Sequence, residues 1–143
     1  MKLSGTSLLL LEDEPLLRRR IASHLEKLGV EVTSAETLAE ATQVVRNLDL
    51  DFALLDVNLP DGRSLSLLEK KVIPASVVVV VMTAEGCVAG AVEAMQLGAA
   101  DYLVKPFEHA ELGVRLARAR RARSAKRGEQ HRREQGVENA DTF

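Results

Sequence analysis

The run Val77–Met82 constrains the fold of this chain more than any other segment, because all six of its residues are apolar. A strand with no polar side must be covered on both faces, as a central strand of a parallel sheet is when helices pack above and below it. The run is also far too short to cross a bilayer. We therefore expect a layered α/β protein with no membrane-spanning segment.

The rest of the chain alternates between short apolar runs and stretches with helical spacing. Strands are expected at residues 7–11, 30–32, 52–57, 77–82 and 102–104, and helices at 16–28, 39–48, 65–68, 88–97 and from about 108 onward. Pro15 stands at the start of the first expected helix and Gly29 just past its end, which are the positions that these residues favour. Five strands and five helices in alternation predict a doubly wound parallel sheet with right-handed crossovers.

Length and composition fit one globular unit that needs no covalent cross-links. A chain of 143 residues can bury most of its apolar surface in one core. Because only 3% of the residues are aromatic, Val, Leu and Ala must build that core. The single cysteine, Cys87, cannot form an internal disulfide, and no signal peptide is evident, so we expect a cytoplasmic protein.

We expect the folded unit to occupy residues 1–122, and residues 123–143 to form a basic helical extension and linker. From Leu112 to Arg133, nine residues are Lys or Arg and one is acidic. Basic helices can bind nucleic acid through its phosphates, but this stretch has no aromatic residue and no recognition-helix pattern. A solvated linker helix that makes no direct contact with nucleic acid is therefore favoured.

Polar residues follow four of the expected strands at their carboxyl ends, the edge where open α/β sheets place their chemistry. These residues are Glu12 and Asp13 after the first strand, Asp56 in the third, Thr83 after the fourth and Lys105 after the fifth. Three carboxylates near one point repel one another unless a cation joins them, and an oxygen-rich ligand set suits Mg²⁺. The sequence therefore predicts a magnesium site at this edge.

The charges of this predicted site suit a phosphoryl group. With Mg²⁺ and the Lys105 ammonium present, the formal charge of the three carboxylates is balanced. A phosphoryl group could then bridge the metal, Lys105 and the Thr83 hydroxyl. Asp56, central among these groups, is the expected nucleophile.

Each of these residues also has a simpler interpretation, which for Lys105 is an ordinary surface lysine. Glu12 and Asp13 could open the first helix, since acids favour a helix amino end. Asp56 could form a side-chain turn before Pro60, and Thr83 could cap a helix. The convergence of all of them on one edge favours the chemical interpretation.

Four motifs resemble the receiver domain of two-component response regulators, over about residues 7–122. They are Leu11–Glu14, Leu55–Gly62, Met82–Ala84 and Asp101–Phe107. The resemblance implies a flavodoxin-like fold with strand order 2-1-3-4-5. It also implies that Asp56 takes a phosphoryl group from a histidine kinase. The segment of residues 63–76 is shorter than is usual in this family. The resemblance therefore does not define the third helix or the loop that follows it.

The resemblance further implies roles for the residues around Asp56. The carboxylate of Asp13 would bind Mg²⁺ with help from Glu12, and the backbone carbonyl of Asn58 would complete the protein ligands. Thr83 and Lys105 would hold the phosphoryl oxygens, and the peptide bond between Lys105 and Pro106 would be cis.

The output step in this family involves a two-state change. Phosphorylation would draw the Thr83 hydroxyl inward and let Tyr102 swing into the vacated space. The face formed by the fourth helix, the fifth strand and the fifth helix would then repack. We expect a homodimer through this face.

Residues 84–107, followed by a basic helix, are similar to the receivers of nitrogen-regulatory-type activators that work with sigma-54. This narrower resemblance implies an ATPase or DNA-binding output domain beyond Phe143. The chain would then be the amino-terminal part of a longer protein. The regulated step would be transcription.

Two competing functions remain open from the sequence. A haloacid-dehalogenase-like phosphatase also uses a strand-end aspartate, a Thr or Ser, a Lys and Mg²⁺, but it normally needs a second aspartate two residues on as general acid. Asn58 occupies that position. The other alternative is a receiver-like adaptor that works without phosphorylation. We expect a signalling module that catalyses only its own phosphorylation and dephosphorylation.

Overall fold

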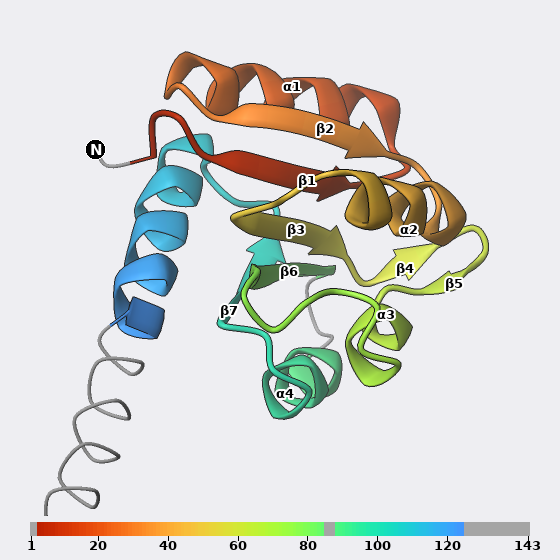
Figure 1. Cartoon of the computed structure of the whole chain (residues 1–143). Helices are drawn as coiled ribbons and strands as arrows, with labels where there is room; N and C mark the ends of the chain where they lie inside the picture. Colours follow the sequence, from red (N-terminus) through yellow and green to blue (C-terminus); the bar gives the residue numbers. More distant parts are fainter. Residues whose placement is uncertain (1–2, 85–87, 125–143) are drawn as a thin grey trace, which may run out of the picture.

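Five parallel strands form the central sheet of the computed structural model, which describes residues 3–84 and 88–124 (Figure 1). The strands are β1 (Ser7–Leu11), β2 (Glu31–Ala35), β3 (Phe52–Asp56), β6 (Val78–Ala84) and β7 (Asp101–Lys105). Their order across the sheet is β2-β1-β3-β6-β7, and every neighbouring pair is parallel. This is the predicted doubly wound order, with β2 and β7 at the edges.

Helices cover both faces of this sheet. They are α1 (Pro15–Lys27), α2 (Leu38–Asn47), α3 (Leu65–Glu69), α4 (Val88–Gln96) and a last helix over residues 109–124, which we call the C-terminal helix. One core cluster joins the sheet to α2, α3 and α4, and a second joins it to α1 and the C-terminal helix. None of the described helices is long and apolar enough to cross a membrane.

Strand β6 confirms the interpretation of the long apolar run. Val79 and Val81 belong to the core cluster on the face of α2, α3 and α4. Val78, Val80 and Met82 belong to the cluster on the opposite face. Successive side chains of a strand point to opposite faces, so a strand that is buried on both faces needs the unbroken apolar sequence found here.

One element was not predicted. Directly after β3, the short strands β4 (Asn58–Leu59) and β5 (Gly62–Arg63) form an antiparallel hairpin. Gly62 has a positive φ of 141°, a backbone conformation that favours glycine. The carboxylate of Asp61 accepts hydrogen bonds from the backbone N–H groups of Leu38 (2.9 Å) and Ala39 (3.2 Å), so the hairpin turn is tied to the amino end of α2.

The expected end of the folded unit falls inside a helix. The C-terminal helix is continuous through residue 124, two residues beyond the expected boundary at 122. Its apolar side chains Leu112, Leu116 and Ala119 are buried against the sheet. The rest of the expected extension, residues 125–143, lies outside the described residues.

Ser64 generates a testable prediction about stability. Its hydroxyl is fully buried and has no hydrogen-bond partner among the described residues. Ser64 precedes α3 but does not cap it with its side chain. An unsatisfied buried polar group costs about 1–3 kcal/mol, so Ser64→Ala should raise the free energy of unfolding by about 1 kcal/mol in urea denaturation.

Ser66→Ala is the matched control, because the Ser66 hydroxyl donates a hydrogen bond to the Arg63 carbonyl at 2.8 Å. This variant removes a hydroxyl that has a partner, and no gain in stability is expected from it. A loss of stability in Ser64→Ala would contradict the interpretation of an orphaned hydroxyl.

Candidate functional site

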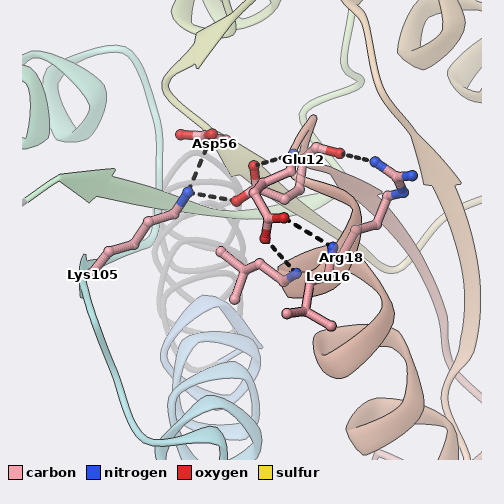
Figure 2. Close-up of polar contacts among 7 residues, drawn as sticks. Glu12, Leu16, Arg18, Asp56 and Lys105 are labelled. Atoms are coloured by element: carbon pink, nitrogen blue, oxygen red, sulfur yellow. Dashed lines mark hydrogen bonds and ion pairs between the residues drawn. The ribbon is translucent and has the colours of Figure 1, made fainter.

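The polar residues predicted at the sheet edge lie together in the structure. Glu12 directly follows β1, Asp56 is the last residue of β3, Thr83 lies near the end of β6 and Lys105 ends β7. Strand register aligns these ends, since Asp56 pairs with Met82 and Ala84 pairs with Lys105. The parallel sheet thus delivers side chains from four strands to one edge, and Figure 2 shows those of Glu12, Asp56 and Lys105.

Three carboxylates form an acidic cluster at this edge, which consists of Glu12, Asp13 and Asp56. Each offers one oxygen atom, and these atoms lie within 4.8 Å of one another. Glu12 is fully buried, Asp56 is partly buried and Asp13 is exposed. No other group of this kind occurs in the described part of the chain. Oxygen ligands at this spacing fit a hard divalent cation with open positions for water.

The ammonium of Lys105 lies between two of these carboxylates. Its Nζ is 2.5 Å from Oε1 of Glu12 and 3.2 Å from Oδ2 of Asp56 (Figure 2). Burial lowers the pKa of Lys105, but the hydrogen bond to Glu12 and the charges of Asp56 and Glu12 outweigh this effect and raise the pKa above its usual value. Lys105 therefore stays protonated and supplies a fixed positive charge.

Glu12 is held in its place at an electrostatic cost. Burial is the largest influence on its carboxyl group and raises the pKa, whereas the hydrogen bond from Lys105 lowers it. The neighbouring Asp56 adds to the upward shift, both through a side-chain hydrogen bond with Glu12 and through its negative charge. The net pKa of Glu12 is therefore raised. One ammonium does not balance three carboxylates, and a further cation would favour the ionised form of Glu12.

The loop between β1 and α1 shows which acid opens the helix. The carboxylate of Glu14 accepts hydrogen bonds from the backbone N–H groups of Leu16 (3.1 Å) and Leu17 (2.6 Å), so Glu14 is the N-cap of α1. The simpler interpretation, in which Glu12 or Asp13 opens this helix, is therefore wrong. Both side chains remain available to the acidic cluster.

The other simple interpretations fare differently. The carboxylate of Asp56 accepts no backbone hydrogen bond from the turn before Pro60 among the described residues, and its ion-pair partner is Lys105. Capping of α4 by Thr83 involves residues 85–87, which lie outside the described residues. The peptide bond between Lys105 and Pro106 is cis, as predicted.

Three predicted residues have positions that fit their expected roles without testing them. Thr83 is buried at 2% exposure, and its hydroxyl lies 3.5 Å from the carbonyl oxygen of Ala84. Tyr102 is 36% exposed on β7, so its ring does not fill the interior in this structure. Asn58 opens β4, two residues after Asp56.

Sequence reasoning missed a contact from Arg18 to the backbone of this loop. The Nη1 group of Arg18 donates a hydrogen bond to the carbonyl oxygen of Glu12 at 2.9 Å. The sequence shows only a run of three arginines, residues 18–20, on the first helix. Which of them reaches back depends on the loop geometry, so no sequence signal singles out Arg18.

The chain matches the model of the family described as the response regulator receiver domain over residues 8–117. The transcriptional regulatory protein FixJ of Azorhizobium caulinodans is 39% identical over 121 residues, which are 84% of this chain and 57% of FixJ. The chain spans a little over half the length of the first curated relatives that it matches.

Two solved structures support this match. NtrX from Brucella abortus aligns with a TM-score of 0.79 and 28% identity, over 88% of this chain and 29% of that one. The beryllofluoride-activated NtrC4 receiver domain, solved as a dimer, aligns with a TM-score of 0.74 and 30% identity, over 81% and 97% of the two chains. Together with the acidic edge and the strand order, the match over residues 8–117 shows that the chain belongs to the response regulator receiver domain family.

Proposed function

We propose that Asp56 accepts a phosphoryl group from the phosphohistidine of a histidine kinase, and that the phosphorylated aspartate signals to an output domain. The observation that carries this proposal is the position of the Asp56 carboxylate at a strand end, 3.2 Å from the Lys105 ammonium and beside two further acids. A partly exposed carboxylate can act as a nucleophile, and the ammonium can match the charge of an incoming phosphoryl group.

In the proposed transfer, a carboxylate oxygen of Asp56 attacks phosphorus in line with the departing imidazole nitrogen. The P–N bond breaks as the new P–O bond forms, and the imidazole leaves with the bonding electrons and takes a proton from solvent. Lys105 neutralises charge on the phosphoryl oxygens, and the Thr83 hydroxyl, at the next strand end, donates a hydrogen bond to another oxygen.

We propose Mg²⁺ as the cation of the acidic cluster. Glu12, Asp13 and Asp56 would supply carboxylate oxygens, and the backbone carbonyl of Asn58 would complete the protein ligands. Mg²⁺ suits such a site because it binds through few carboxylates and keeps several waters. When bound, the ion supplies positive charge that offsets the carboxylates and the phosphoryl oxygens.

The chain would catalyse only its own phosphorylation and dephosphorylation. A haloacid-dehalogenase-like phosphatase would need a general acid two residues after the nucleophile, where Asn58 stands. Membership of the receiver family also favours a signalling role. Without a built-in general acid at this position, Asp56 would hold the phosphoryl group as a timed signal.

The surface beside Lys105 offers a place for the kinase. A groove of about 470 Å³ opens there and is lined in part by Leu17, Phe107 and His109. A phosphodonor protein must cover this part of the sheet edge to bring its histidine to Asp56. Its partly apolar lining suits contact with another protein.

The proposed output is control of transcription, as the name of FixJ states for that relative. The resemblance of residues 84–107 to nitrogen-regulatory-type receivers supports an output of the sigma-54 type, through an ATPase or DNA-binding domain beyond residue 143.

The lone cysteine, Cys87, suits action in the reducing cytoplasm.

We propose that the face of α4, β7 and the C-terminal helix switches on phosphorylation and forms a homodimer. Movement of the Thr83 hydroxyl toward the phosphoryl group would open space for Tyr102. Large apolar side chains are exposed on this face: Val92, Met95, Tyr102, Val104 and Val114. The NtrC4 receiver domain, to which this chain is similar, was solved as a dimer.

Asp56→Asn should abolish labelling by a small phosphodonor such as phosphoramidate, because the amide is not a nucleophile at this site. Mass spectrometry of the intact protein measures the label. Asp49→Asn, at an exposed position outside the acidic cluster, is the control and should label like the wild type. Retained labelling of Asp56→Asn would rule out the assignment, and sustained turnover of a phosphate ester would revive the phosphatase.

Mg²⁺ should raise the free energy of unfolding by about 2.7 kcal/mol at a concentration one hundred times its dissociation constant, if it binds the folded chain alone. Asp13→Asn should lose most of this stabilisation, because it removes a charged ligand from the cluster. Asp49→Asn should retain it. Urea denaturation with and without Mg²⁺ measures this stabilisation. If Mg²⁺ stabilises both variants equally, the ion binds elsewhere.

Beryllofluoride with Mg²⁺ should shift the mass of the chain toward a dimer in sedimentation measurements over a range of concentrations. Val104→Arg should weaken the dimer, because it places a charge on the proposed face, where Val104 is 40% exposed. Leu48→Arg is a matched control, since Leu48 is 46% exposed at the end of α2. A monomer mass that is independent of concentration, with and without beryllofluoride, would exclude the homodimer.

A further inference from the structure

We propose that Arg18 is a positioning residue for the cation site. Its guanidinium fixes the peptide group that joins Glu12 to Asp13 and so directs the Asp13 carboxylate toward the acidic cluster. The inference rests on the proposed function of that cluster as a Mg²⁺ site. It assigns a role to a residue that contributes no ligand atom.

The contacts of Arg18 join three parts of the chain, and Figure 2 shows the contact to Glu12. Arg18 lies in the first turn of α1, and its Nη1 donates to the carbonyl oxygen of Glu12 at 2.9 Å. Its Nη2 lies 2.9 Å from Oε1 of Glu36, just past the end of β2. The Arg18 side chain is only 15% exposed, so it is enclosed between the helix and the two strand ends.

The carbonyl oxygen of Glu12 belongs to the peptide group that precedes Asp13. A peptide group is planar and rigid, so holding its oxygen also fixes the direction of the Asp13 N–H and the position of its Cα. Asp13 is itself exposed, and its backbone has no hydrogen bond among those found for the described residues. Its placement therefore depends on how its neighbours are held.

Those neighbours are held on both sides. The backbone N–H of Glu12 donates to the carbonyl oxygen of Ala35 at 3.1 Å, which extends the pairing of β1 with β2. The backbone N–H of Glu14 lies 3.3 Å from Oε2 of Glu12, and Glu14 also caps α1. The bond from Arg18 is the one side-chain contact in the described chain that holds the Glu12 carbonyl.

The fork of a guanidinium suits this role better than an ammonium would. Arg presents several N–H donors in one plane, so two of them can reach two acceptors in fixed directions. The Glu36 side chain is 56% exposed, and an ion pair with an exposed partner contributes little by itself. The bond to the Glu12 carbonyl is therefore the contact that matters for the site.

A positioning role and a purely electrostatic role predict opposite effects on Mg²⁺ binding. Arg18 carries a positive charge near a cation site, so removing that charge alone would reduce repulsion and tighten Mg²⁺ binding. If Arg18 positions Asp13, its removal loosens a ligand and weakens binding. The sign of the change thus separates the two roles.

The test is titration calorimetry of the full chain with Mg²⁺ for Arg18→Ala and for Arg19→Ala, a control at the adjacent, exposed position. Arg18→Ala should weaken Mg²⁺ binding about ten-fold, the lower end of the range for residues that orient metal ligands. Arg19→Ala should bind as tightly as the wild type or slightly more tightly. Arg18→Lys should bind more tightly than Arg18→Ala but less tightly than the wild type.

A second readout needs no metal. In the metal-free chain, hydrogen exchange at the Glu14 amide, which follows Asp13 and donates to Oε2 of Glu12, should be faster in Arg18→Ala than in Arg19→Ala. Glu36→Gln should leave both readouts close to wild type, because the bond to the Glu12 carbonyl remains. If Arg18→Ala does not fold, Arg18→Lys carries the same comparisons.

The outcomes separate this inference from the function on which it rests. A wild-type chain that fails to bind Mg²⁺ would overturn the proposed metal site. A wild-type chain that binds Mg²⁺, together with an Arg18→Ala variant that binds it equally or more tightly, would overturn the positioning role alone.

Discussion

The repulsion among three carboxylates at one sheet edge is the constraint on which the site depends. Glu12, Asp13 and Asp56 bring their oxygen atoms within 4.8 Å of one another, and the Lys105 ammonium offsets only part of their charge. Such an arrangement costs stability, because burial above all, and then the neighbouring Asp56, raise the pKa of Glu12. This charge imbalance is the physical basis of the cation site and the phosphoryl site that we propose at this edge.

The rest of the fold supplies the rigidity that holds these charges together. Both faces of β3 and β6 are covered by helices, so the strand ends that carry Asp56 and Thr83 cannot shift apart without disrupting the core. The loop after β1 has no such cover. It is held by hydrogen bonds instead: Glu14 caps α1, and Arg18 binds the Glu12 carbonyl.

The sequence predicted the strands and the acidic edge because both follow from simple patterns. The unbroken apolar run in β6 required cover on both faces, and polar residues at the ends of apolar runs had to meet at one edge once the strands were parallel. The family motifs then predicted the cis bond before Pro106, which the structure contains.

The parts that were missed depend on contacts between segments. The hairpin of β4 and β5 has strands of only two residues each, too short for any period to appear in the sequence. Asp61 caps α2 from 23 residues away, and Arg18 binds a backbone oxygen, so neither contact leaves a side-chain pattern. Glu14 was missed as the cap because three acids in a row precede Pro15, and only the geometry of the turn decides among them.

The central claim is that Asp56, among all the acids of this chain, forms the bond to phosphorus. The most direct measurement is to treat the chain with phosphoramidate and Mg²⁺, reduce the acyl phosphate with borohydride and locate the resulting homoserine by peptide mass spectrometry. Homoserine is expected at residue 56 and at no other aspartate, and only in samples that contained Mg²⁺. Homoserine at Asp13 or another aspartate, or equal labelling without the metal, would contradict this claim.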